Sequence, residues 1–167
     1  MQIIRDTREK QGWEFVFYDD VESIVSKKID CGDYTTALLK DEVVFERKAS
    51  VVEIATNLGI TSNRERFYRE CERMKSLKRA YIICEFQENQ VLSFPTEDDR
   101  AVIERERKFS KNKEGVKVRL NGRYLRKLLA DLERSYPNIE VVFAGSRDAA
   151  EKFTHDMLKY WEKRKLS

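Results

Sequence analysis

Histidine is almost absent from this chain of 167 residues, in which His155 is the only one. Nuclease motifs built from several histidines are therefore excluded, and any catalysis is expected to use carboxylates, lysine, arginine or a metal ion. His155 itself is interpreted as a packed or surface residue. Cysteine is also scarce: Cys31, Cys71 and Cys84 are odd in number, far apart and without the paired spacing of a zinc site. They predict reduced thiols, as in a cytosolic-type compartment.

Long hydrophobic runs are missing as well. No apolar stretch approaches the roughly 20 residues of a membrane span, and the first ten residues, MQIIRDTREK, contain charges that do not fit a secretory signal. We therefore expect a soluble intracellular protein, in the cytoplasm or with the nucleoid or nucleus. With 6 Gly, 2 Pro and 41% hydrophobic residues, the composition is typical of a folded chain, and we expect a single domain over residues 1–167.

Charge is nearly balanced in total but uneven along the chain. The 33 basic and 30 acidic residues leave a net charge of +3, which alone does not indicate a nucleic-acid partner. Residues 1–58 carry a net charge of −4, whereas residues 64–79 and 100–127 carry +4 and +8. This asymmetry suits a protein that binds metal ions through carboxylates and a polyanion through Arg and Lys. Each basic segment alone is also typical of a solvated helix face.

The hydrophobic pattern predicts strands first and then alternating helices and strands. Strands are expected at 1–4 and, as an antiparallel meander of three, at 21–30, 34–40 and 43–48. Later elements are helices at 51–59 and 62–77, the second begun by a Ser62/Glu65 capping box, a strand at 80–86, a helix from Asn121 to Pro137, a strand at 139–144 and a helix after Ser146. Residues 97–119 are expected to be part helix and part loop. This order predicts a three-layer α/β domain around a mixed central sheet.

Two carboxylates and a lysine are predicted to meet on this sheet. Glu46 and Lys48 are two residues apart on one strand, so their side chains leave the same face. Asp33 follows a glycine turn, and a hairpin return brings it close to Glu46. Two neighbouring carboxylates repel unless a metal bridges them, and Mg²⁺ binds through one or two carboxylates while keeping waters for a substrate phosphate. The arrangement indicates phosphodiester hydrolysis, with Lys48 orienting the attacking water or stabilising developing charge.

Three motifs occur in order and at fitting distances: Asp6-Thr7-Arg8-Glu9, Gly32-Asp33-Tyr34 and Glu46-Arg47-Lys48. They resemble the signature of the XPF family of structure-specific endonucleases, a branch of the PD-(D/E)xK superfamily. The similarity continues through 66–71, 78–86 and the closing helix-strand-helix. The resemblance implies a restriction-endonuclease-like fold and cleavage of branched, flapped or junction DNA with Mg²⁺ or Mn²⁺, in DNA repair or recombination. It implies metal ligands at Asp33 and Glu46, a catalytic lysine at Lys48, and essential roles in the same site for Asp6, Arg8 and Glu9.

Two features depart from the family pattern. The family usually places an aspartate four residues after the motif lysine, where this chain has Val52 followed by Glu53. Either Glu53 substitutes in part or the metal site lacks a supporting carboxylate. The family's nuclease domain is also commonly followed by a tandem helix-hairpin-helix module, which residues 1–167 do not contain. DNA binding is then expected from the domain itself, from a partner protein or from a homodimer.

The basic segments supply the candidate DNA contacts. We expect Arg64, Arg66, Arg69 and Lys75 to contact the phosphate backbone, which positions a duplex without reading its sequence. Lys108, Lys111, Lys113, Lys117 and Arg119 form either a second phosphate clamp or a solvated loop. Two alternatives to the main hypothesis stay open: a catalytically silent domain that binds DNA or dimerises, and a related nuclease acting on four-way junctions or linear ends. The intact Asp33, Glu46 and Lys48 set favours an active enzyme.

Overall fold

The structure, a computed structural model, describes residues 1–109 and 120–167. Strands and helices follow one another in the order expected from the hydrophobic pattern, with one further short helix at 88–92 that was not predicted. The strands are β1 (Gln2–Arg5), β2 (Ser23–Ser26), β3 (Tyr34–Thr36), β4 (Val43–Lys48), β5 (Arg79–Cys84) and β6 (Ile139–Phe143). The helices are α1 (Val51–Gly59), α2 (Thr61–Met74), α3 (Glu88–Leu92), α4 (Glu97–Phe109), α5 (Gly122–Ser135) and α6 (Arg147–Leu166).

The strands form one mixed sheet in the order β2-β1-β3-β4-β5-β6. β3 is antiparallel to both β1 and β4, and the remaining neighbours are parallel. The prediction of a three-strand meander was therefore wrong, because β2 pairs with the outer edge of β1 and not with β3. A parallel pair needs a long crossover connection, and residues 6–22 provide it by burying Trp13 and Phe15 before the chain returns to the edge.

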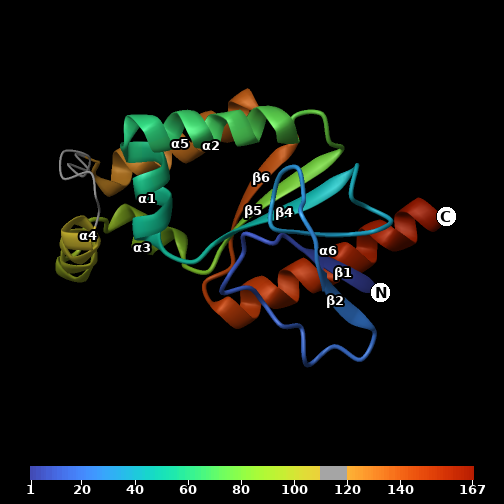
Figure 1. Ribbon diagram of the computed structural model, residues 1–167. Helices are drawn as coiled ribbons and strands as arrows, with labels where there is room; N and C mark the ends of the chain where they lie inside the picture. Colours follow the sequence, from blue (N-terminus) through green and yellow to red (C-terminus); the bar gives the residue numbers. More distant parts are fainter. Residues whose placement is uncertain (110–119) are drawn as a thin grey trace.

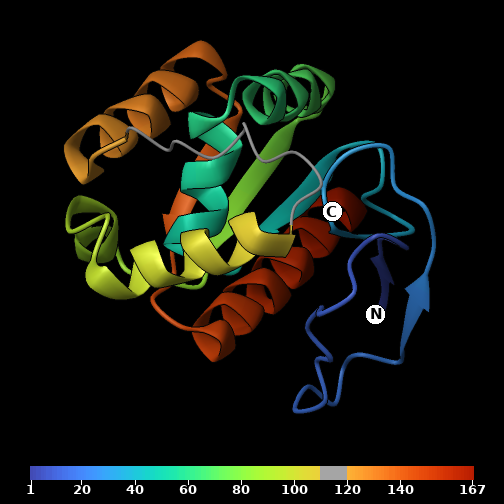
Figure 2. The same cartoon turned by 60° about the vertical axis from the view of Figure 1, so that its left-hand side comes forward.

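Helices cover both faces of the sheet, which confirms the mixed-sheet α/β prediction. α6 lies across one face, and α1, α2 and α5 lie on the other (Figure 1, Figure 2). Each face has its own apolar core. Val44 packs with residues of α1, α2 and α5, whereas its neighbours Val43 and Phe45 pack with Ala150 and Leu158 of α6. All six residues of β4 are buried, so this strand is covered on both sides.

Polar side chains cap the beginnings of α1, α5 and α6. The side chains of Ser50, Asn121 and Ser146 accept hydrogen bonds from the backbone N–H groups of the first turns of α1, α5 and α6. The capping box predicted at Ser62 was wrong. α2 begins at Thr61, directly after the Ile60 N–H has bonded back to the Thr56 carbonyl, so Ser62 already lies inside the helix.

The scarce residues lie in structural positions. All three cysteines are free and buried. His155 is buried on α6, where its ring stacks on Tyr18 with centroids 4.0 Å apart and its Nε2 lies 2.7 Å from Oδ1 of Asp20. The histidine therefore fastens the 6–22 connection to α6, in agreement with its interpretation as a packed residue. No helix of the described residues is both long and apolar enough to cross a bilayer.

Candidate active site

The end of β4 brings Glu46 and Lys48 together, as their spacing predicts. Both side chains are buried, and Nζ of Lys48 lies 2.7 Å from Oε1 of Glu46. They leave β4 on the face covered by α1 and α2, whereas Arg47 between them points to the opposite face. The Lys48 ammonium also lies 3.4 Å from Oε1 of Glu53, on the first turn of α1. The lysine is therefore shared between a strand carboxylate and a helix carboxylate.

Asp33 reaches the same place through the turn that precedes β3. Gly32 has φ +78°, and a side chain there would also press on Val44, so the turn requires glycine. The Asp33 N–H donates to the Phe45 carbonyl, and Oδ2 of Asp33 accepts from the Arg47 N–H, both at 2.8 Å. These bonds fix Asp33 beside β4. The predicted meeting of Asp33, Glu46 and Lys48 is observed.

These three side chains line one cavity of about 300 Å³. Arg8, Glu53 and Arg66, which the sequence also indicated, line it too. Five further residues of α1 and α2 were not predicted. The helical spacing of positions 63, 66, 67, 70 and 73 places them on one face of α2, but only the packing of α2 shows that this face meets the cavity. The missed residues are Asn57, Asn63, Phe67, Glu70 and Arg73.

The site holds more buried negative charge than its lysine balances. Burial raises the pKa of Asp33, and the neighbouring Glu46 raises it further. Burial also raises the pKa of Glu46, against the opposing effect of Lys48. Burial would lower the pKa of Lys48, but the charges of Glu46 and Glu53 raise it instead. Lys48 is thus a cation in this arrangement, and the two carboxylates would gain from a further positive charge.

Asp6 contributes to the site through Arg8. Its carboxylate is buried and accepts from the backbone N–H groups of Arg8 and Ile29, at 2.8 and 2.7 Å, and from Arg8 Nε at 2.6 Å. Although burial opposes ionisation, the bonds to Arg8 and Ile29 lower the pKa of Asp6. Asp6 does not line the cavity, but it directs Arg8 toward it. Its place is that of a positioning residue.

Glu9 lies outside the cavity. It faces Arg47 on the other side of β4, with 3.5 Å between Arg47 Nη1 and Glu9 Oε2. Arg47 also binds both carboxylate oxygens of Glu85, at 2.7 and 3.1 Å, and Trp13 Nε1 donates to the same carboxylate. The structure therefore separates Glu9 from the other predicted site residues, because its ion-pair partner has the opposite orientation on the strand. A role for Glu9 in catalysis stays a prediction.

The predicted DNA contacts on α2 occupy different surroundings. Arg66 lines the cavity, whereas Arg64 and Arg69 do not. Lys75, at the end of the helix, is exposed, and its Nζ lies 3.8 Å from Oε2 of Glu72. The second clamp predicted at Lys108, Lys111, Lys113, Lys117 and Arg119 falls outside the side chains that the structure describes.

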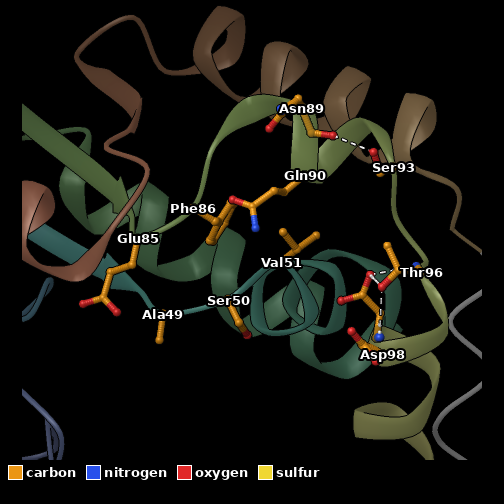
Figure 3. A pocket seen from close by; sticks show the side chains of 11 residues that line it. Ala49, Ser50, Val51, Glu85, Phe86, Asn89, Gln90, Ser93, Thr96 and Asp98 are labelled. Carbon is orange, nitrogen blue, oxygen red and sulfur yellow. Dashed lines mark hydrogen bonds between the residues drawn. The ribbon is translucent and has the colours of Figure 1, made fainter.

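A larger cavity of about 540 Å³ lies at the other side of the first turn of α1. Figure 3 shows Gln90 extending from α3 toward Val51 and Ser50 at the start of that helix. The lining residues that the structure describes include Glu85, Asp98 and Asp99 but no Lys or Arg. The charges of these described residues would repel a phosphate, so the smaller cavity is the better candidate for DNA chemistry.

Comparisons with known proteins agree with this arrangement. The family model of the ERCC4 domain matches residues 5–157. A solved structure described as XPF from Aeropyrum pernix has a TM-score of 0.64 and 16% identity, covering 98% of this chain and 66% of that one. A second, described as XPF from Aeropyrum pernix in complex with DNA, has a TM-score of 0.61 and 18% identity, covering 99% and 67%.

The chain thus spans about two thirds of the length of these two relatives. The comparison with curated proteins found no match. The TM-scores show a shared fold at low sequence identity, and the family model supplies the relationship in sequence over most of the chain. This chain therefore belongs to the ERCC4 domain family, the XPF-type nucleases that its three motifs resemble.

Proposed function

We propose that this protein is a metal-dependent endonuclease that hydrolyses phosphodiester bonds in branched, flapped or junction DNA. The observation that carries the proposal is the meeting of Asp33, Glu46 and Lys48 in one cavity, beside Arg8 and Arg66. Carboxylates that can hold a cation, next to side chains that can bind a phosphate, are what this reaction needs.

The residues present fit a magnesium or manganese ion. Within the described residues, no three His, Cys, Asp or Glu side chains are close enough to bind one ion together. Mg²⁺ does not require such a group, because it usually takes one or two carboxylates and keeps several waters. Asp33 and Glu46 would hold it, and their raised pKa values reflect the electrostatic cost that a cation would remove. When bound, the ion would polarise the phosphate and make water more acidic.

The remaining side chains have separate tasks. Lys48, held by Glu46 and Glu53, places a positive charge where the pentavalent phosphate would develop negative charge. Asp6 keeps Arg8 pointed toward the cavity, where its guanidinium can bind a phosphate oxygen. Arg66 offers a second phosphate contact from α2. These contacts read the backbone and not the bases, which favours recognition of DNA shape over sequence.

Two further observations support DNA as the substrate. One of the relatives is described in complex with DNA, and this chain shares its fold. The predicted basic helix α2 also borders the cavity, so a DNA strand bound along this helix would pass the carboxylates. The choice among flap, junction and other branched structures rests on the family resemblance.

The proposal is tested by incubating the protein with end-labelled duplex, flap, nicked, three-way and four-way DNA in Mg²⁺ or Mn²⁺. We expect cleavage near the branch point and little cleavage of plain duplex. Adding excess EDTA should stop the reaction. Cleavage that continues unchanged in EDTA would remove the metal from the proposal. Tight binding without cleavage in either metal would instead favour the silent DNA-binding domain.

A further inference from the structure

Glu70 is a carboxylate of the cavity that was not among the predicted site residues. It lies on α2, is half-buried, and lines the cavity with Asp33 and Glu46. Its Oε1 is 3.4 Å from the N–H of Gly32, the residue before Asp33. Phe67, Cys71 and Met74 are buried on the same helix, so their packing fixes the face that Glu70 presents.

Within the part of the chain that the structure describes, the carboxylate of Glu70 forms no salt bridge. Three positive groups around the cavity have other partners: Arg8 binds Asp6, Lys48 binds Glu46 and Glu53, and Arg73 Nε donates to the Asp30 carbonyl. Arg66 also lines the cavity, with an exposed side chain. The negative charge of Glu70 therefore acts on the cavity that it lines together with Asp33 and Glu46.

The other candidates for a supporting carboxylate are already occupied. Val52, at the position of the family's aspartate, is buried in the core between the sheet and α1. Glu53 does face the cavity, but its two oxygens accept from Lys48 Nζ at 3.4 Å and from the Ala49 N–H at 2.8 Å. Glu53 is thus engaged in holding Lys48 and the start of α1. Glu70 remains as the carboxylate that can respond to a cation.

We propose that Glu70 is the third carboxylate of the metal site and supplies the support that the missing aspartate at Val52 would give. The inference rests on the proposed function, because it presumes a cation at Asp33 and Glu46. Since no three acidic side chains of the described residues are within joint ligating reach, Glu70 acts on the ion through its hydration shell. It is a positioning residue for the ion and not a direct ligand.

The test is Mn²⁺ binding measured by isothermal titration calorimetry without DNA. The wild-type chain is compared with Glu70→Gln, which removes the charge at constant shape, and with Glu70→Asp, which keeps it on a shorter arm. Glu65→Gln is the matched control, because Glu65 is exposed on α2 and does not line the cavity. We expect Glu70→Gln to weaken Mn²⁺ binding roughly tenfold, at the lower end of what outer partners of metal sites contribute. The Mn²⁺ affinity of Glu70→Asp should lie between those of wild type and Glu70→Gln. Glu65→Gln should bind Mn²⁺ like wild type.

The outcomes separate this inference from the proposed function. Wild type that binds no Mn²⁺ overturns the metal assignment and Glu70 with it. Wild type and Glu70→Gln that bind Mn²⁺ equally overturn the role of Glu70 alone and leave the nuclease proposal standing. Circular dichroism checks each fold. If Glu70→Gln does not fold, the comparison of Glu70→Asp with Glu65→Gln decides, and equal affinity there contradicts the inference.

Discussion

Lys48 is buried and paired with carboxylates, unlike a lysine on the protein surface. It is buried between Glu46 and Glu53, and its ammonium lies over the ring of Phe67, 5.3 Å from the centroid. A group held so firmly loses little entropy when it meets a developing charge, so it can contribute selectively to the transition state.

Replacing Lys48 with alanine should therefore reduce the single-turnover rate far more than DNA affinity. We expect a rate loss of about 10²- to 10³-fold, the range for removing one preorganised electrostatic group. The rate is measured at saturating DNA with Mg²⁺, and affinity is measured in Ca²⁺. A variant that binds DNA poorly yet cleaves at the normal rate once saturated would show Lys48 to be only a phosphate contact.

Two hypotheses were open for Glu53. Either it replaces the family's aspartate in part, or the metal site lacks that supporting carboxylate. Its neighbour Val52 belongs to the apolar core, so the helix turns Val52 inward and Glu53 toward Lys48. The partial replacement predicted for Glu53 therefore has a geometric basis, through the lysine.

Glu53→Gln should lower activity modestly, because the amide keeps an acceptor for the Ala49 N–H but loses the charge near Lys48. With Glu53 partly exposed, the ion pair is expected to contribute up to about 1 kcal/mol, or up to about fivefold in rate. Cleavage rates of Glu53→Gln and Glu65→Gln, compared at saturating metal, provide the measurement. Full activity of Glu53→Gln would mean that Glu46 alone positions Lys48.

At the scale of elements, α2 combines two tasks on two faces. One face packs Phe67, Cys71 and Met74 into the core and brings Glu70 to the cavity. The exposed face carries several of the basic residues that were predicted, as one group, to contact DNA. The structure divides that group, because Arg66 borders the cavity while Lys75 lies beside Glu72 at the end of the helix.

A triple variant should bind all DNA sequences more weakly and to the same extent. It carries alanine in place of Arg64, Arg66 and Lys75. On duplex DNA each side chain that neutralises a phosphate adds roughly −0.9 to the log-log salt slope, so the slope should become shallower by about one for each such side chain removed. Arg66 is expected to account for more of the change than Lys75, since Lys75 already has a carboxylate neighbour. Affinities at several salt concentrations give the slope. An unchanged slope would move these residues to a protein interface, such as that of a homodimer.

Element prediction was most successful where burial leaves a simple pattern. The apolar run of β5 and the periodicity of α1, α5 and α6 were sufficient to locate these elements. The pairing of β2 could not be derived in the same way, because its four residues are half-buried or exposed and specify no partner. Its position depends on the long 6–22 connection, whose course is set by tertiary contacts of Trp13 and Phe15.

At the scale of the whole molecule, the site joins segments that the chain keeps far apart. Strand spacing and a glycine turn predicted the meeting of Asp33, Glu46 and Lys48, because those relations are local to two paired strands. The sequence could not show that Glu9 would face the other side of β4 or that Glu70 would reach the cavity from α2. Both placements follow from how separate elements pack, which a local pattern does not encode.

The ionised carboxylate of Asp33 lowers the stability of the folded state. Since burial and the neighbouring Glu46 raise the pKa of Asp33 in the folded state, ionisation of Asp33 disfavours folding. This penalty is complete above the folded-state pKa, shrinks as pH falls through that pKa, and is gone below the unfolded-state pKa. A neutral amide in its place retains the acceptor for the Arg47 N–H and removes the repulsion with Glu46. Function and stability are therefore expected to oppose each other at this residue.

The most direct test of the account compares wild type with Asp33→Asn and Glu46→Gln in one cleavage assay on branched DNA with Mg²⁺, alongside thermal melting in EDTA. Both variants should lose detectable cleavage while still binding DNA, and Asp33→Asn should melt at or above the wild-type temperature. Cleavage by either variant at the wild-type rate would contradict the assignment of Asp33 and Glu46 as the metal-binding pair of a nuclease.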